Sequence, residues 1–540
     1  MKNLYLEKIT AARKAFASGD KARAEQLLLD CAGAHGNPIP VLIELVQLYR
    51  ALKQPEKSIP ILKELARIDR TDLSHLSELA HTFQALGRNA EAAQTYRQVV
   101  SQRSDLPNTW FNLAWNLTRA GELQEAIAAY ERAISCGIGG KDEVYLNIAG
   151  IHATLKNFLE SKKCLDKALD VNPRYIPALF NLGSYYEEQG LREEAEKLYQ
   201  QCLREDPGFH PALCRLSHMS RGGDNSELLM EKIRRLLATE LPESAREELL
   251  FAEGKLLDEC GRYAEAWRSF GSANLLGKKR VPPFDVENLK GRIREIISFK
   301  KEYTPCLPQA ESTPSSLFIC GMFRSGSTLL EQIIGGHSEI VSGGELYYFS
   351  DAFKRRGAAY PEFYDWATGC GGLASGYLSF VQKRFGAGNI GMLTDKSPEN
   401  FMYVGLIKAL FPKSKFIWTR RNFEDNRLSI FFQHLGEALN YSVDLQWIRQ
   451  YYEQQQLLME YWCSKFPDSI YEIHYERLIE SPREEIEGLF GFLGLPWEDA
   501  CLNFRGRKNH VQTASIWQVR EDLHSRSVGR FKNYRPFLSE

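Results

Sequence analysis

The sequence lacks the features of a membrane-spanning or disulfide-stabilised protein. No stretch approaches the roughly twenty apolar residues that a membrane span needs, and the N-terminal MKNLYLEKITAARKAF has neither the apolar core nor the cleavage site of a signal peptide. The 11 cysteines are scattered without a CxxC pair or clustered histidines, which indicates neither a zinc site nor a disulfide framework. We therefore expect a cytoplasmic protein with reduced thiols, no resident metal and no membrane span.

The chain also lacks an excess of charge of either sign. Its 68 lysines and arginines stand against 69 aspartates and glutamates, which leaves a net charge of -1. No overall field attracts nucleic acid or an anionic membrane, so nucleic acid is not an expected partner and any anion site must be built locally. A length of 540 residues exceeds what one hydrophobic core usually serves, and we expect at least two domains.

The first half of the chain repeats itself with a period near 34 residues. The first large position of successive repeats falls on Lys8, Leu42, Leu76, Trp110, Tyr145 and Leu179. A small residue late in each repeat is followed, one helical turn on and on the same face, by a large one: Ala24 and Leu28, Ser58 and Leu62, Ala92 and Tyr96, Ala126 and Tyr130, Ser161 and Leu165, Ala195 and Tyr199. This period is similar to that of the two-helix tetratricopeptide repeat (TPR), and it predicts an all-α solenoid over residues 1–285.

The repeat pattern also has a degenerate stretch and an end. The register slips over residues 213–248 and returns with Ala266 and Phe270, which predicts a degenerate repeat followed by a final one. Solenoids of this kind present a concave groove, so we favour a protein or peptide acceptor bound there over a plain spacer. A segment rich in proline, serine and threonine at 301–316 predicts a linker, placed at residues 286–316.

Short apolar runs alternate with helical stretches in the second half. The runs at 317–320, 391–393, 415–419 and 469–473 predict β-strands. Their alternation with helices predicts an α/β domain over residues 317–540, with a parallel sheet covered on both faces. Ligands of such sheets bind beyond the carboxyl ends of the strands, which is where the polar motifs of this chain fall.

The first polar motif, GMFRSGST at 321–328, lies between a predicted strand and a predicted helix. A strand, a glycine-bearing turn and a helix N-terminus make an anion cradle of P-loop type, because backbone N–H groups and the helix dipole converge. Ser327 stands where nucleotide triphosphatases have the lysine that reaches the β- and γ-phosphates, which disfavours an ordinary ATPase or GTPase. Arg324 supplies a guanidinium that can hold two oxygens of a phosphate or sulfate.

Further motifs follow in order: GGEL at 343–346, TDKSP at 394–398, RRNFEDNRLS at 420–429, HYE at 474–476, and TASIWQV and SVGRF near the C-terminus. With these motifs residues 317–540 resemble the sulfotransferases that use 3′-phosphoadenosine-5′-phosphosulfate (PAPS), in particular the protein-tyrosine sulfotransferase branch and its TPR-linked relatives. The resemblance implies a transferase that moves a sulfuryl group from PAPS to an acceptor hydroxyl, with a protein or peptide tyrosine as the first hypothesis.

The resemblance also implies residues that bind PAPS. The 5′-phosphosulfate would lie on Arg324, Ser325, Gly326, Ser327 and Thr328. Arg421 and Ser429, eight residues apart, would clamp the 3′-phosphate, and Arg420 is an adjacent rival. Tyr475 is the candidate for stacking on adenine, with a core tyrosine as the even alternative, and Arg530 would help to hold the cofactor phosphates.

Catalytic roles follow from the same resemblance. Glu345 would take the proton from the acceptor hydroxyl, Lys396 and Arg324 would stabilise the developing negative charge, and Ser515 would donate to the transferring group. Four histidines remain alternative bases: His434, His474, His510 and His524.

Two other functions stay open from the sequence. One is a P-loop kinase, which predicts dependence on ATP and Mg²⁺ and is disfavoured by the missing lysine. The other is a TPR scaffold whose second domain binds nucleotide without turnover, which predicts indifference to Glu345→Gln.

Overall fold

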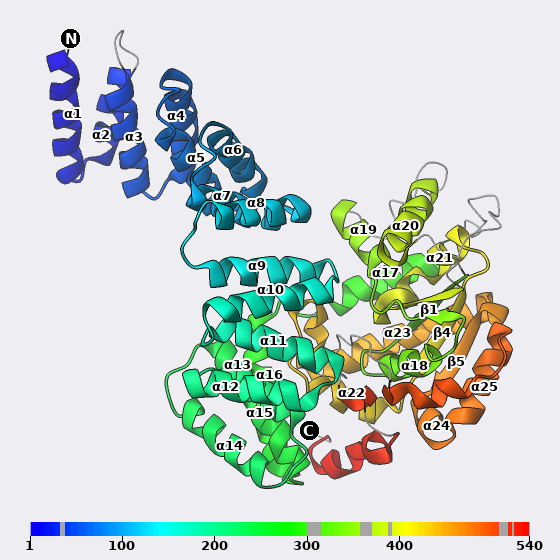
Figure 1. The fold of residues 1–540 in the computed structure, drawn as a ribbon. Helices are drawn as coiled ribbons and strands as arrows, with labels where there is room; N and C mark the ends of the chain where they lie inside the picture. The colour runs from blue at the N-terminus through cyan, green and yellow to red at the C-terminus, as the bar shows by residue number, and fades with distance from the viewer. Residues whose placement is uncertain are drawn as a thin grey trace. The chain divides into compact units, whose positions relative to one another are not determined.

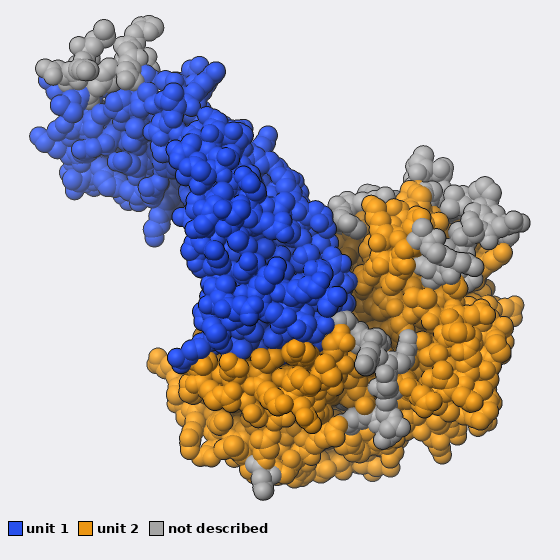
Figure 2. Space-filling view, viewed as in Figure 1, with its two compact units in different colours: residues 1–185 blue, residues 186–540 orange. Residues whose placement is uncertain are grey.

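The computed structural model describes residues 2–32, 38–299, 315–356, 370–386, 391–506, 517–520 and 523–538. The chain divides into two compact units, residues 1–185 and residues 186–540 (Figure 2). The first unit consists of helices, and the second combines further helices with one β-sheet (Figure 1). No helix within the described ranges is long and apolar enough to cross a membrane.

The first unit confirms the repeat predicted from the sequence. Each of its small and large repeat positions, from Ala24 to Leu165, is buried where consecutive helices pack on each other. A small side chain allows this close approach. The helices are α1 (Lys2–Ala17), α2 (Lys21–Ala32), α3 (Ile39–Ala51), α4 (Pro55–Ile68), α5 (Ser74–Ala85), α6 (Asn89–Gln102), α7 (Pro107–Ala120), α8 (Leu123–Ser135), α9 (Lys141–Thr154) and α10 (Phe158–Val171).

Repeat helices continue into the second unit. Ala195, Tyr199, Ala266 and Phe270 are all buried, which agrees with the predicted repeat positions. The helices here are α11 (Ile176–Gln189), which spans the division, α12 (Arg192–Glu205), α13 (His210–Met219), α14 (Asp224–Leu237), α15 (Glu243–Glu259) and α16 (Tyr263–Arg280).

Part of the predicted linker is a helix, α17 (Val286–Ser298). The Asp285 side chain accepts from the backbone N–H of Asn288 at the helix start. Leu289, Ile293 and Ile296, spaced to share one face, are buried in the core that also contains sheet residues. Helix α17 thus lies inside the predicted linker and packs into a core of the sheet. The domain boundaries expected at 286–316 stay a prediction.

A five-stranded sheet forms the centre of the second unit, and it confirms the parallel sheet predicted from the sequence. Its order is β2-β3-β1-β4-β5, and every neighbouring pair is parallel. The two-residue strand β2 had no separate signal in the sequence. The strands are β1 (Ser315–Gly321), β2 (Ile340–Val341), β3 (Met392–Lys396), β4 (Lys415–Arg420) and β5 (Ile470–His474).

Alternate residues of β1 enter two different cores. Phe318 and Cys320 pack into one core and Leu317 and Ile319 into the other, as the period of two along a strand requires. The first core contains residues of α17, α19 (Tyr348–Arg356), α20 (Cys370–Phe385), α21 (Val404–Leu410) and α23 (Leu445–Lys465). The second contains residues of α18 (Ser327–Ile334), α24 (Tyr475–Glu480) and α25 (Pro482–Leu493). Both faces of the sheet are thus covered.

Candidate active site

The turn after β1 has an unusual backbone and is fixed to the neighbouring strand. Arg324 and Gly326 both have left-handed backbone conformations, with φ of 64° and 96°. An arginine in this conformation is strained, and such strain collects at functional sites. The Ser325 hydroxyl lies 2.6 Å from the Thr419 hydroxyl on β4, which fixes the turn to the neighbouring strand. Ser327 and Thr328 then open α18 and are buried.

Gly326 packs directly against Tyr475, the first residue of α24. A Cβ atom at position 326 would lie 2.5 Å from Cδ2 of Tyr475, a distance that real Cβ contacts do not reach. The guanidinium of Arg421 lies 4.7 Å from the centre of the same tyrosine ring, within cation–π range. The ring of Tyr475 therefore lies at the turn, and it also packs against the second core.

Arg421 is bonded to the main chain of the turn, and Arg420 is paired with a residue of β5. Nη1 of Arg421 donates to the carbonyl oxygen of Arg324 over 3.1 Å, and Nη2 donates to the carbonyl oxygen of Ser527 over 2.6 Å. Nε of Arg324 donates in turn to the hydroxyl of Ser429, in α22 (Phe423–Phe431), over 3.1 Å. Arg420 instead pairs with Glu472 at 2.6 Å. The arrangement favours Arg421 over its rival.

The two arginines at the turn lie close together and are partly buried. Burial, with the neighbouring charge of Arg421, lowers the pKa of Arg324 to about 10. Burial also lowers the pKa of Arg421. Both shifts mean that the charged guanidinium is less favourable here than in water. A highly charged anion between the two arginines would make the charged form favourable again. The charge arrangement thus suits a phosphate or sulfate group.

Lys396 and Glu345 form a close pair at the end of β3. Nζ of Lys396 lies 2.5 Å from Oε1 of Glu345, and the lysine side chain is only 2% exposed. The hydroxyl of Tyr347 donates to the other oxygen of Glu345. Burial and the carboxylate raise the pKa of Tyr347, so this tyrosine stays a donor. The candidate base and the candidate cation are therefore in direct contact.

The loop that carries Glu345 is braced by Glu331, which sequence reasoning missed. Oε1 of Glu331 accepts from the backbone N–H of Gly344 over 3.0 Å and from the hydroxyl of Thr394 over 2.6 Å. The carboxyl is buried in α18, and burial raises its pKa. The available signal was a lone acid in the otherwise apolar helix start TLLEQII, since a buried carboxylate needs partners.

The site predicted from the sequence includes two C-terminal residues, Ser515 and Arg530. Ser515 lies outside the described residues. Arg530 opens the 3₁₀ segment Arg530–Phe537 and pairs with Asp258 of α15. Asp425, also missed from the sequence, accepts from the backbone N–H groups of Gly529 and Phe531 over 2.6 and 2.8 Å. The main chain on both sides of Arg530 is thereby fixed to α22.

Two of the alternative bases are engaged elsewhere. His434 lies 3.4 Å from Glu247, and His474 lies 2.8 Å from Glu472. His510 lies outside the described residues. These positions favour Glu345 over His434 and His474 as the group beside Lys396.

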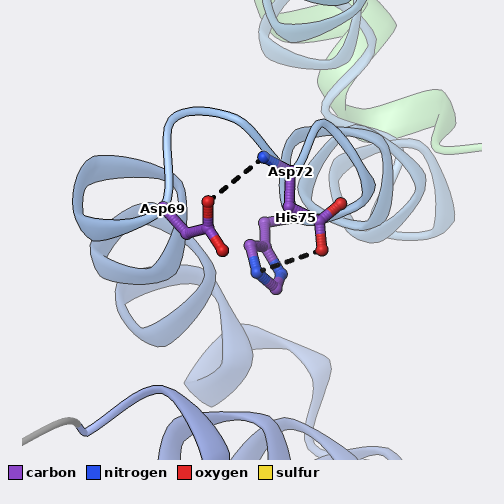
Figure 3. A group of neighbouring side chains, drawn as sticks. All are labelled: Asp69, Asp72 and His75. Atoms are coloured by element: carbon purple, nitrogen blue, oxygen red, sulfur yellow. Dashed lines mark hydrogen bonds and ion pairs between the residues drawn. The ribbon is translucent and has the colours of Figure 1, made fainter.

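One group with metal-ligand chemistry lies in the first unit, between α4 and α5. Asp69, Asp72 and His75 bring one ligand atom each to within 4.8 Å of one another (Figure 3). Both carboxylates already accept hydrogen bonds from the turn, Asp69 from Thr71 and Asp72, and Asp72 from the backbone N–H of Ser74. These hydrogen bonds explain why the three residues lie together, because they form the turn that begins α5.

Comparisons with known proteins agree with the two halves of this description. Residues 314–499 match the family described as "Sulfotransferase family", and residues 77–141 and 142–204 match models described as "Tetratricopeptide repeat". The matches thus place similarity to tetratricopeptide repeats and similarity to the sulfotransferase family in separate parts of the chain.

Individual relatives cover parts of the chain. An uncharacterized protein of Aquifex aeolicus (strain VF5) is 30% identical over 401 residues, which are 71% of this chain and 52% of that protein. Protein-tyrosine sulfotransferase 1 of Danio rerio is 24% identical over 200 residues, 35% of this chain and 55% of that protein. The chain spans about half the length of these two relatives. The solved sulfotransferase domain from the Synechococcus PCC 7002 olefin synthase aligns with a TM-score of 0.33 and 18% identity, covering 42% of this chain and 90% of that domain.

Proposed function

We propose that this protein transfers a sulfuryl group from PAPS to an acceptor hydroxyl. The observation that carries the proposal is the meeting of Arg324, Arg421 and Ser429 at the turn after β1, with Tyr475 beside them. Two partly buried guanidiniums and a hydroxyl suit a ligand with separate anionic groups and an aromatic ring. PAPS has this composition, with a phosphosulfate, a 3′-phosphate and adenine.

The parts of the donor would divide among the residues of this site. The backbone of 324–328 and the start of α18 would hold the phosphosulfate. Arg421 and Ser429 would hold the 3′-phosphate, Tyr475 would stack on adenine, and Arg530 would add positive charge near the phosphates. Together these contacts would distinguish PAPS from a nucleotide without a 3′-phosphate.

The chemical step would be an in-line displacement at sulfur. Glu345 takes the proton of the acceptor hydroxyl as its oxygen bonds to sulfur. The bond between sulfur and the bridging phosphate oxygen breaks, and adenosine-3′,5′-bisphosphate leaves with that electron pair. Lys396 stabilises the charge on the leaving oxygen, with Arg324 and Ser515 at the transferring group. A lysine that turns from Glu345 to the leaving oxygen frees the carboxylate for its role as base.

The proposal also covers the acceptor, the absence of a metal from the reaction and the location of the protein in the cell. A peptide or protein tyrosine is the first acceptor, because tetratricopeptide arrays bind peptides in their grooves and a relative is named a protein-tyrosine sulfotransferase. The cations of the step come from side chains, so the proposal includes no metal. A cytoplasmic location fits Cys31, Cys164 and Cys214, which are free thiols.

Incubation with PAPS that carries labelled sulfur tests this function. Tyrosine-containing peptides, oligosaccharides and small alcohols serve as parallel acceptors, and ATP with Mg²⁺ serves as the rival donor. Label on peptide tyrosine is the expected result. Label on carbohydrate alone would overturn the tyrosine acceptor, and phosphate transfer from ATP would overturn the sulfotransferase assignment. Binding of PAPS without transfer to any acceptor would favour the scaffold.

A further inference from the structure

The C-terminal segment is bonded to the repeat helices of the second unit. Nε1 of Trp517 donates to Oε1 of Glu187 in α11 over 2.8 Å. The guanidinium of Arg192, at the start of α12, lies 4.4 Å from the centre of the Trp517 ring. Nη2 of Arg520 donates to the carbonyl oxygen of Glu188 over 2.5 Å. Three different interactions thus join residues 517–520 to the turn between α11 and α12.

The glycine in that turn leaves room for Arg520. Gly190 has a φ of 79°, and a Cβ atom there would lie 2.6 Å from Cδ of Arg520. A larger residue would displace the arginine side chain and strain the turn. The backbone of the repeat turn therefore accommodates the C-terminal segment closely.

Glu187 is a buried carboxylate whose partners come from three segments: α12, α13 and the C-terminal segment. It is 1% exposed, and Oε2 accepts from the hydroxyl of Tyr199 in α12 over 2.8 Å and from Nε of Arg215 in α13 over 2.9 Å. Trp517 supplies the donor for the other oxygen. A buried carboxylate oxygen without a donor is costly, so the contact with Trp517 stabilises the repeats as well as the segment.

Asp258 of α15 provides a second attachment, to the part of the segment that carries Arg530. Its two oxygens accept from Nη2 of Arg530 and from the hydroxyl of Tyr534. The main chain around Arg530 is held at the turn after β1, because Nη2 of Arg421 donates to the carbonyl oxygen of Ser527 and Asp425 of α22 accepts from the N–H groups of Gly529 and Phe531. Besides burial, the positive charge of Arg530 also helps to lower the pKa values of Arg324 and Arg421. Arg530 therefore belongs to the same electrostatic cluster as the turn after β1, and a carboxylate of the repeats is its counter-ion.

We propose that the last repeat helices complete the donor site, with Glu187 and Asp258 as positioning residues. The two carboxylates hold Trp517 and Arg530, and through them the C-terminal segment, in the place where Arg530 adds to the anion-binding charge of Arg324 and Arg421. The repeats thereby contribute to nucleotide affinity in addition to any acceptor that they bind. This inference rests on the proposed function, because it assigns the anion to the PAPS site.

Two conservative variants of the full-length chain test the proposal. Asp258→Asn keeps an acceptor for Tyr534 and removes the counter-charge of Arg530. Trp517→Phe keeps the ring under Arg192 and removes the donor to Glu187. Titration calorimetry with adenosine-3′,5′-bisphosphate should show affinity lower by roughly 10-fold for each, the range of one hydrogen bond to a charged group. The KM for PAPS should rise in parallel, and kcat should stay within about threefold of the wild-type value.

A matched tryptophan provides the control. Trp110 in α7 donates from its own Nε1 to the carbonyl oxygen of Ser104 over 2.9 Å, and it belongs to the first unit. Trp110→Phe removes the same kind of bond from a repeat and should leave bisphosphate affinity unchanged. Thermal unfolding of all variants separates a loss of positioning from a general loss of stability.

A double-variant cycle connects Asp258 to its target. If Asp258 acts through Arg530, the addition of Asp258→Asn to Arg530→Met should change bisphosphate affinity by less than twofold. Wild-type affinity in Asp258→Asn and Trp517→Phe would overturn the inference while the proposed function stands. Equal additional losses in the Arg530→Met background would also overturn it. A wild-type chain that binds no bisphosphate would overturn the proposed function itself.

Discussion

Lys396 and Glu345 are joined by a 2.5 Å contact between Nζ and Oε1. A lysine that is 2% exposed depends on a counter-charge, because an unpaired buried cation is costly. The same contact satisfies the carboxylate that the proposed reaction uses as a base. A ligand oxygen that replaces Glu345 beside Lys396 would therefore release the base at the moment when the leaving group arrives.

Replacement of Glu345 by glutamine should lower turnover without weakening donor binding. Glutamine keeps the size of the side chain and cannot take a proton from the acceptor. General base catalysis contributes about 10²- to 10⁴-fold, so kcat for sulfuryl transfer should fall by at least about 100-fold. Bisphosphate affinity, measured by calorimetry, should stay within about threefold.

The exposed Glu339 offers a matched control, since it lies just before β2, whereas Glu345 lies in the loop after that strand. Glu339→Gln should have wild-type turnover. Wild-type turnover in Glu345→Gln would instead show that Glu345 is not the base. The histidines would then be the candidate bases.

Arg421 and Arg420 should differ in how they affect recognition of the 3′-phosphate. Arg421→Lys keeps a positive charge and loses the planar fork. The affinity ratio between PAPS and adenosine 5′-phosphosulfate, which lacks the 3′-phosphate, should fall by roughly 10- to 100-fold, as expected for a charged hydrogen bond. Arg420→Lys, at the residue paired with Glu472, should leave the ratio unchanged. Competition binding with the two nucleotides measures this affinity ratio. A larger fall in Arg420→Lys than in Arg421→Lys would assign the 3′-phosphate to Arg420.

The sequence predicted the two architectures because both depend on local periodicity. The 34-residue spacing of small and large residues requires the helix pairs, and residues such as Ala126 and Tyr130 are buried as that spacing predicts. The strands and the turn at 321–328 also carry local signals. The placement of Arg421 beside Arg324 follows from the adjacency of β4 and β1, which strand propensity alone does not determine.

The parts that sequence reasoning missed depend on tertiary partners. Helix α17 lies where composition indicated a linker, because prolines and serines after residue 300 outweighed the spacing of Leu289, Ile293 and Ile296. Glu331 brings together a helix, a loop and a strand, and no short motif encodes such a contact. The bond between Glu187 and Trp517 joins positions 330 residues apart, beyond the reach of any periodicity.

Asp395 should make stability depend on pH. Burial raises the pKa of Asp395 to about 7, with the charge of Glu331 acting in the same direction, whereas an unfolded aspartate titrates near 3.9. The folded chain binds this proton more tightly, so the stability it contributes is present below about pH 4 and is lost as the pH rises to about 7.

Asp395→Asn removes this titration and keeps an acceptor for Asn400, which donates to Asp395. The free energy of unfolding of the variant, relative to wild type, should increase between about pH 4 and 7 by an amount on the order of 4 kcal/mol. It should then stay constant at higher pH. Urea unfolding at a series of pH values measures the difference. A difference independent of pH would show that Asp395 titrates normally.

Enlargement of a small repeat position should destabilise the first unit. Ala126 in α8 is fully buried, and leucine there would force the paired helices apart. Ala126→Leu should lower the free energy of unfolding by about 1–3 kcal/mol. Ala128→Leu, at an exposed position of the same helix, should change it by less than about 0.5 kcal/mol. Equal effects in denaturant unfolding would contradict the close packing at Ala126.

The contacts of the C-terminal segment have a consequence for how the chain matures. Trp517 and Glu187 are 330 residues apart and Arg530 and Asp258 are 272 apart, so these bonds form only after the chain as far as residues 517 and 530 has left the ribosome. Closure of such long loops is slow compared with the pairing of adjacent repeat helices. The repeats thus fold while the Glu187 carboxylate still lacks its indole partner, and the proposed donor site is completed only when Trp517 and Arg530 come into place.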